Sequence, residues 1–248
     1  SNFNNITFSG AGTKTATGAL TIAGNLSLTN NFTAGSFTHT VSGNWTNSGT
    51  FTATGSTIDF NGTTQSIGAT TFNNFTTSNS GTKTAGGNLT INGNLDNGGT
   101  SNNALTLDMG TNTLSVSGTK DNTGATIKFG GTSNGIAISS GTIEYNGTNQ
   151  TVATGTYATL NLTSASTYTP NGSLTATTLD NGGSSNNAAT LNMAGNTLSA
   201  TTIENTNSTI KFSGASNGVA VSTGTIEYYG SSQTIASGTY NNLTNNQS

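Results

Sequence analysis

The stretch TIEYNGTNQTV (142–152) recurs twice more in the chain, as TIDFNGTTQSI (57–67) and as TIEYYGSSQTI (225–235). An aromatic residue follows each copy and opens the next repeat module: Phe72, Tyr157 and Tyr240. When the rare residues of a chain recur at regular intervals, they indicate a repeat architecture. We therefore expect these residues to serve the fold, which makes an enzyme improbable.

Between these landmarks the apolar residues alternate in short bursts, as in LTIAGNL (20–26) and LTINGNL (89–95). Strict alternation is typical of strands that bury one face. Asn-Gly and Gly-Gly pairs separate the bursts and favour turns, because a positive φ costs glycine and asparagine little. The pattern predicts an all-β chain without helices.

The bursts begin about every 17 residues, which predicts about 14 coils of roughly 15 to 21 residues each. Modules 72–156 and 157–239 hold five such steps, whereas module 3–71 holds four. A closed immunoglobulin-like sandwich does not readily lose a fifth of its chain, but a solenoid can lose one coil at local cost. The sequence therefore predicts a single β-solenoid segment over 1–248, a parallel β-helix, that ends in the partial module 240–248.

The composition excludes several classes of protein. Only 5% of the 248 residues are charged, the net charge is −3, and there is no cysteine. The chain has no basic stripe for nucleic acid or anionic lipid, and no apolar run approaches the roughly 18 residues of a membrane span. Because the chain begins inside one module and ends inside another, we expect it to be a segment of a longer protein.

The candidate site residues are structural positions of the repeat. They are the acidic residues Asp59, Glu144 and Glu227, the glutamines Gln65, Gln150 and Gln233, and the aromatics Phe72, Tyr157 and Tyr240. The acidic residues are expected to mark the same rung of successive modules, and the glutamines to hydrogen-bond a turn beside the TIxF/Y strand. Residues at equivalent positions of successive modules lie several rungs apart, so they cannot converge as a general acid and base. We therefore expect no catalytic residue and no cofactor.

Other rare residues also favour structural roles. His39 has no second His or Cys with which to complete a zinc site, so it is expected to be a wall or turn residue. The Asp-Asn-Gly-Gly segments 96–99 and 180–183 could suggest calcium, but they lack the several carboxylates that calcium needs, and turns are the better interpretation. Trp45 aligns with Leu26 and Leu95 in one expected core column, which favours an inward ring over a sugar-stacking platform.

Long runs such as GALTIAGNLSLTNNFTAGSFTHTVSGNWTNSGTFTATG (18–55) resemble the coils of filamentous-haemagglutinin-type adhesins and the β-strand repeats of bacterial autotransporter passengers. The resemblance covers nearly the whole chain and rests on its low-complexity pattern. It implies a right-handed parallel β-helix that is exported to the cell surface and used as a stalk or for adhesion. No catalytic residue comes with it.

The sequence thus predicts a structural rod, stalk or filament-forming segment of an extracellular bacterial surface protein. Its expected partner is itself, through end-to-end or lateral assembly, or further repeats of the same chain. Two alternatives remain. One is an adhesin that binds carbohydrate or a host or cell surface, and the other is an ice-binding solenoid. The second rests on Thr-x-Thr triplets, which would have to lie in register on successive rungs: Thr13/Thr15, Thr50/Thr52, Thr82/Thr84 and Thr111/Thr113.

Overall fold

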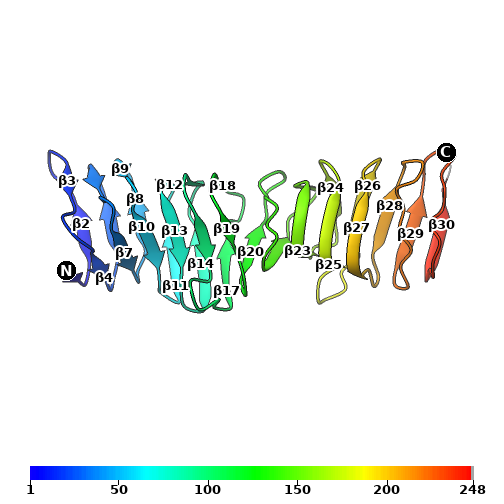
Figure 1. Ribbon diagram of the computed structural model, residues 1–248, viewed down its shortest axis with the longest axis horizontal. Helices are drawn as coiled ribbons and strands as arrows, with labels where there is room; N and C mark the ends of the chain where they lie inside the picture. Colours follow the sequence, from blue (N-terminus) through cyan, green and yellow to red (C-terminus); the bar gives the residue numbers. More distant parts are fainter. Residues whose placement is uncertain (247–248) are drawn as a thin grey trace. The chain divides into compact units, whose positions relative to one another are not determined.

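The computed structural model describes residues 1–246, and every regular element in this range is a β-strand (Figure 1). The strands are parallel and stack as a β-solenoid of about 13 turns with a spacing of about 19 residues. The chain divides into two compact units, unit 1 (Ser1–Ile127) and unit 2 (Lys128–Ser248). The end of the predicted partial module 240–248 lies outside the described residues. The all-β parallel solenoid predicted from the sequence is confirmed.

Unit 1 has three walls of parallel strands. The seven-stranded sheet contains β1 (Asn2–Phe3), β4 (Thr21–Ile22), β7 (Thr38–Val41), β10 (Thr57–Phe60), β13 (Asn74–Thr77), β16 (Leu95–Asn97) and β19 (Lys120–Asp121). A second wall contains β2 (Ile6–Phe8), β5 (Leu26–Leu28), β8 (Trp45–Asn47), β11 (Thr64–Ile67), β14 (Gly81–Ala85) and β17 (Leu105–Asp108). Two three-stranded sheets complete the coils: β3 (Lys14–Thr15), β6 (Phe32–Thr33) and β9 (Phe51–Thr52), then β12 (Thr70–Phe72), β15 (Leu89–Ile91) and β18 (Leu114–Val116).

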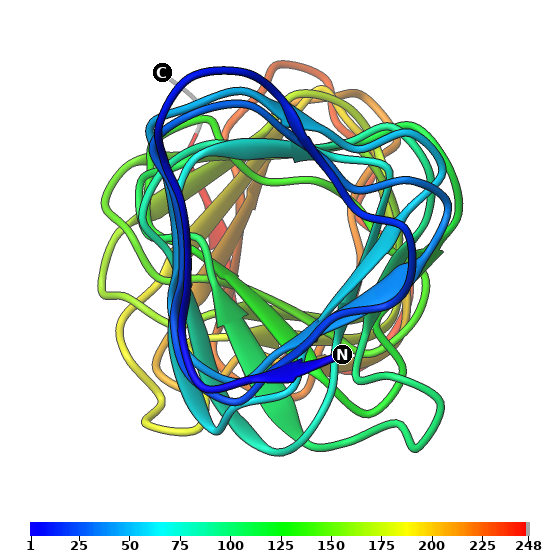
Figure 2. The same ribbon diagram turned by 90° about the vertical axis from the view of Figure 1, so that its left-hand side faces the viewer.

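The backbone of unit 1 winds around one interior, and its coils overlie one another in the end-on view of Figure 2. Inward residues alternate with outward ones, so most side chains in the interior of unit 1 are apolar, with a few buried polar side chains among them. Its centre is an aromatic cluster in which Trp45 contacts Phe51, Phe60 and Phe72 at ring-centroid distances of 5.0, 5.9 and 5.5 Å. Large buried rings of this kind contribute most of the packing energy of a thin core.

Asparagine side chains link the coils of unit 1 at one corner. The backbone N–H of Asn25 donates to Asn5 Oδ1 at 2.7 Å, the N–H of Asn44 to Asn25 Oδ1 at 2.8 Å, and the N–H of Ser66 to Asn44 Oδ1 at 2.8 Å. A Cβ on the nearby Gly43 would lie 2.3 Å from the carbonyl carbon of Gly24, so only glycine lets the coils approach here. Asparagine amides thus link successive coils of unit 1 along the coil axis.

Unit 2 contains two sheets, and β20 (Thr126–Phe129) crosses the boundary at its start. One sheet contains β21 (Thr142–Tyr145), β23 (Gly155–Leu162), β25 (Leu174–Asn181) and β27 (Leu198–Glu204). The six-stranded sheet contains β22 (Gln150–Val152), β24 (Thr167–Pro170), β26 (Thr190–Ala194), β28 (Thr209–Phe212), β29 (Thr225–Tyr228) and β30 (Asn242–Asn245). In the interior of unit 2 some inward residues stack on residues of the same type: Ile210 of β28 pairs with Ile226 of β29.

The structure corrects the alignment of repeats onto columns. Leu26 pairs with Trp45, as expected, but Leu95 lies in the seven-stranded sheet and pairs with Phe75 and Lys120. Apolar bursts counted as successive coils can fall on different walls of one coil, as Thr57 in β10 and Phe72 in β12 do, because the next turn begins only at Asn74, the register partner of Thr57. This is why the count of about 14 coils exceeds the observed number of turns.

Candidate functional site

The three recurrent glutamines join neighbouring coils through the same set of hydrogen bonds. The Oε1 atom of Gln150 accepts from the N–H of Gly147 at 2.6 Å, and its Nε2 donates to the carbonyls of Phe129 and Gly131 at 2.9 and 2.7 Å. Gln65 and Gln233 repeat this arrangement one module earlier and later. The predicted role in a turn is confirmed, and the glutamine also binds the preceding coil.

The recurrent acidic residues lie on outer faces and are engaged by neighbouring coils. Glu144 pairs with Lys128 and Glu227 pairs with Lys211, each at 3.1 Å. Asp59 accepts from Ser78 Oγ at 2.7 Å. In unit 2, Glu144 lies on β21, whereas Glu227 lies on β29 of the six-stranded sheet, so repeat equivalents do not share one wall. The expectation that they mark the same rung of successive modules stays a prediction.

The module-opening aromatics belong to the core or its border. Phe72 and Tyr157 are buried, and Tyr240 is half-buried. The hydroxyl of Tyr157 donates to the carbonyl of Ala153, whose N–H donates in turn to the hydroxyl of Tyr145. Burial raises the pKa of Tyr157 far above its usual range, so the hydroxyl stays protonated as a donor. The ring therefore anchors a turn.

The side chains of Lys83 and His39 project into the interior of unit 1. Lys83 is fully buried, and its ammonium donates to the carbonyls of Ser78 and Asn79 at 3.0 and 2.8 Å. His39 is also buried, with Nδ1 accepting from the N–H of Leu20 at 3.2 Å and Nε2 lying 2.9 Å from the carbonyl of Ala34. His39 is thus a residue of the β7 wall whose ring points inward. Both side chains satisfy backbone groups that the coil would otherwise leave unpaired.

His39 and three half-buried carboxyl groups should change the stability of the fold in opposite directions as the pH falls. Burial lowers the pKa of His39 from 6.5, so the unfolded chain binds the proton first and stability is lost as the pH falls below that value. Burial raises the pKa of Asp59, Asp96 and Asp180 above 3.8, so the folded chain binds those protons first and stability is regained as the pH falls toward 3.8.

We therefore expect the free energy of unfolding to fall from pH 7 toward pH 5 and to rise again toward pH 4. Urea denaturation at each pH measures it. In His39→Leu the first decrease should be absent, while the rise toward pH 4 remains. Loss of stability in His39→Leu as the pH falls from 5 to 4, where the histidine no longer contributes, would contradict the assignment of the three carboxyl groups.

Each Asp-Asn-Gly-Gly segment contains a buried asparagine, Asn97 or Asn181. The amide of Asn97 donates to Asn122 Oδ1 at 2.6 Å, and in unit 2 that of Asn181 donates to Asn205 Oδ1 at 2.7 Å. Among residues 1–246, no group of three or more His, Cys, Asp or Glu side chains could hold a metal ion. The structure places the Asp-Asn pair at the end of a strand, β16 or β25, and only the Gly-Gly pair in the turn that follows.

The two buried asparagine pairs, Asn97 with Asn122 and Asn181 with Asn205, differ in one hydrogen bond. Thr77 Oγ1 donates to Asn97 Oδ1 at 2.6 Å, whereas the register partner of Asn181 is Leu162. Asn181 Oδ1 consequently has no hydrogen-bond partner although the side chain is buried. An unsatisfied buried acceptor costs about 1–3 kcal/mol.

Leu162→Thr should therefore raise the free energy of unfolding by up to about 1 kcal/mol, because the new hydroxyl would satisfy Asn181 while some apolar contact is lost. The reciprocal change Thr77→Leu should lower it by about 1–3 kcal/mol. Urea denaturation of both variants measures the difference. If Leu162→Thr destabilises the protein as strongly as Thr77→Leu does, the unsatisfied Oδ1 of Asn181 does not limit stability.

Trp45 is buried, and its Nε1 donates to Thr70 Oγ1 at 2.9 Å. The inward ring predicted from the sequence is confirmed, so Trp45 provides no surface platform.

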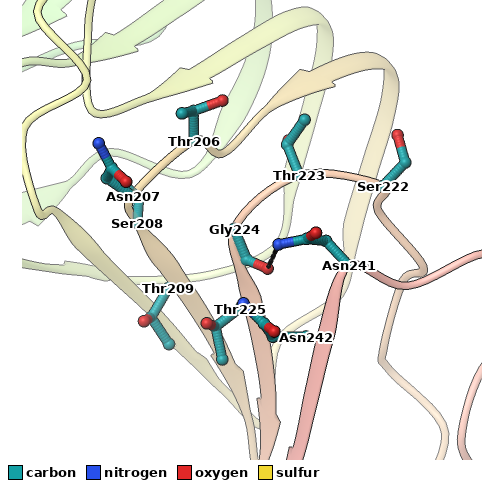
Figure 3. Close-up of a pocket in the computed structure, with 10 residues that line it drawn as sticks. All are labelled: Thr206, Asn207, Ser208, Thr209, Ser222, Thr223, Gly224, Thr225, Asn241 and Asn242. Carbon is teal, nitrogen blue, oxygen red and sulfur yellow. Dashed lines mark hydrogen bonds between the residues drawn. The ribbon is translucent and has the colours of Figure 1, made fainter.

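The surface of unit 2 has a hollow of about 350 Å³ lined by hydroxyl and amide groups (Figure 3). Thr209, Thr225 and Asn242 lie side by side in register on β28, β29 and β30, and Asn241 Nδ2 donates to the carbonyl of Gly224 at 3.2 Å. None of the lining residues has a titratable side chain. The hollow can therefore offer hydrogen bonds but no general acid or base.

A second hollow, of about 370 Å³, lies in unit 1 and includes Asp96 and Asp121. The two residues are register partners on β16 and β19. Burial raises the pKa of Asp96, and the neighbouring charge of Asp121 raises it further. Asp121 Oδ1 also accepts from the N–H and the hydroxyl of Thr123 at 2.9 and 2.7 Å, so this carboxyl group takes part in the contacts of its own turn.

The structure contains no helix long and apolar enough to cross a membrane in the part of the chain that it describes. The predicted site residues serve the contacts between coils, and the structure distributes them over several sheets. Comparison with protein-family models gave no match, and comparisons with curated proteins and with solved structures gave no significant match.

Proposed function

We propose that the chain is a rod or stalk segment of an extracellular bacterial surface protein. The observation that carries this proposal is the use of the rare polar side chains. Gln150, His39 and Lys83 each bond backbone groups of the coil stack, instead of converging on a substrate site. The low content of charge and the absence of cysteine suit an exposed structural segment. Catalysis has no part in this proposal.

Immunogold electron microscopy of the intact protein on its native cells tests the proposal. Antibodies against the 248-residue segment should label material that extends from the cell surface. Labelling confined to the cell interior would refute it.

The proposal includes stacking onto further coils, in the same chain or in a second copy. Phe3 in unit 1 and Ile235 and Leu243 in unit 2 are the exposed large hydrophobic residues among those described, with exposed fractions of 42%, 44% and 44%. Strand edges with exposed apolar side chains favour pairing with another strand. Sedimentation of the segment should show association that increases with concentration and decreases in Leu243→Lys. Equal association in the variant would argue against stacking through β30.

A second candidate function is ice binding, and one surface of unit 1 favours it. On β3, β6 and β9, Thr15, Thr33 and Thr52 lie in register on three successive rungs. Thr15 and Thr52, each from one of the predicted triplets, therefore lie on one sheet, while Thr82 and Thr84 lie on β14 of another wall. Ordered hydroxyl columns are the feature that ice matching requires.

Thermal hysteresis of the purified segment tests this candidate. Hysteresis that disappears in Thr33→Lys would support it, because the charged side chain interrupts the middle rung. No hysteresis at high protein concentration would end it.

A further inference from the structure

Tyr229 is an aromatic residue that the repeat does not require. The equivalent position is Asn61 in the first TIxF/Y copy and Asn146 in the second. The second and third copies make the same backbone hydrogen bond at this position. The N–H of Asn146 donates to the carbonyl of Phe129, and the N–H of Tyr229 donates to that of Phe212, both at 3.0 Å. The aromatic ring is therefore an addition to an unchanged coil.

The ring of Tyr229 lies across the outer face of the six-stranded sheet. Residue 229 directly follows β29, yet its hydroxyl donates to Asn192 Oδ1 on β26 at 2.8 Å. The order of strands is β26, β28, β29, so the side chain spans β28 on its way. Lys211 of β28 lies against the ring, with Nζ 5.2 Å from the ring centroid. The side chain of Tyr229 is half-buried, so part of the ring remains accessible beside Lys211.

Polar groups surround this ring in the register of the sheet. Asn192, Lys211, Glu227 and Thr244 form one outward column on β26, β28, β29 and β30. Lys211 and Glu227 form an ion pair at 3.1 Å, so the column carries no net charge. An aromatic face with hydrogen-bonding groups beside it, held in place before binding, is the arrangement that recognises a sugar ring.

We propose that Tyr229 is the stacking platform of a binding site for neutral saccharides on the outer face of β26, β28 and β29. The apolar face of a pyranose ring lies on the tyrosine ring, and its hydroxyl groups bond to the neighbouring amide, carboxylate and ammonium groups. The balanced ion pair favours a neutral sugar over an anionic one. This site is independent of the rod function, and the residues predicted from the sequence did not include it.

The previous module provides a matched control. Lys128 and Glu144 form the same ion pair at the same distance, 3.1 Å, but Asn146 stands in the place of Tyr229. Tyr229→Asn therefore gives the third module the residue that the second module carries naturally, and we expect it to fold. Asn146→Tyr places the ring beside the ion pair of the second module.

Saturation-transfer NMR and calorimetric titration with cello-, malto-, xylo-, manno- and chito-hexaose test the proposal on the 248-residue chain. We expect at least one of these neutral oligosaccharides to bind with Kd on the order of 1 mM or tighter. Tyr229→Asn should weaken this binding at least about tenfold, whereas Tyr229→Phe should retain most of it because the ring face remains. Asn146→Tyr should increase the number of sites per chain.

Three results would overturn the proposal. The first is the absence of binding to every oligosaccharide of the panel at millimolar concentration. The second is unchanged binding in Tyr229→Asn, with circular dichroism confirming that the variant is folded. The third is stronger binding of an acidic oligosaccharide, such as oligogalacturonate, than of any neutral one.

Discussion

Deletion of residues 159–177 should leave unit 2 folded, although the deletion removes a whole coil. Thr159 of β23 and Thr178 of β25 are register partners, so the cut joins Ala158 to a residue that occupies the same place one rung later. Leu179 then takes the inward position of Leu160, and alternation is preserved on both sides of the junction. Coils of a solenoid contact only their neighbours, so the loss should amount to one coil and its interface.

Deletion of residues 159–167 should instead abolish folding of unit 2. The cut joins Ala158 directly to Tyr168 of β24. A strand of the six-stranded sheet then stands in the place of the β23 residues that pair with β25. The strands on either side of the junction lose their register with each other, and a register error exposes the hydrophobic set of a strand. This is the largest effect that we expect.

Circular dichroism and urea denaturation separate the two outcomes. The coil deletion should keep a cooperative transition with a smaller m-value, because less surface is exposed on unfolding. The half-coil deletion should lose the transition that belongs to unit 2. Equal loss of structure in the two variants would show that unit 2 is not built from separable coils.

Gln150→Glu should destabilise the protein by roughly 3–5 kcal/mol. The substitution keeps the shape of the side chain, but a carboxylate cannot donate to the carbonyls of Phe129 and Gly131. Two buried acceptors lose their donor, and either a charge is buried or the carboxyl group takes up a proton. The free energy of unfolding from urea denaturation at pH 7 measures the loss.

Gln233→Glu is the matched control for this prediction. Its bonds have the same pattern, but the side chain is half-buried and its Nε2 lies 3.2 Å from the carbonyl of Phe212. Water can solvate a carboxylate there, so the loss should be clearly smaller. If the two variants lose the same stability, burial is not what makes Gln150 important.

The features that follow from local pattern could be predicted from the sequence. Alternation and Asn-Gly turns predicted parallel strands in coils, and the recurrence of Gln65, Gln150 and Gln233 predicted a shared role in a turn. The inward direction of Trp45 followed from its alignment with Leu26, which is its register partner. Each of these inferences depends on neighbouring residues or on adjacent coils.

The assignment of residues to walls could not be predicted in the same way. It depends on how many residues each corner takes up, and the corners of this chain vary. Leu95 lies on a different wall from Leu26, and Glu144 and Glu227 lie on different sheets of unit 2. A repeat in sequence therefore does not guarantee a repeat in space when a module does not contain a whole number of turns. The platform at Tyr229 has a signal in the sequence, a tyrosine where the other copies have asparagine, but its meaning depends on the outward direction of the ring.

Distances between pairs of spin labels within unit 1 test the central claim, parallel coils stacked in register, most directly. Thr21, Thr40, Asp59, Thr76, Asp96 and Asp121 follow one another across six strands of the seven-stranded sheet. The chain has no cysteine, so labelled cysteine pairs can be introduced at chosen positions. Labels at Thr21 and Thr76, and at Thr21 and Asp121, should be separated by about 4.8 Å for each rung between them, so that the second distance exceeds the first by about two rungs. Distances that do not increase with the number of rungs would contradict the stacked-coil account.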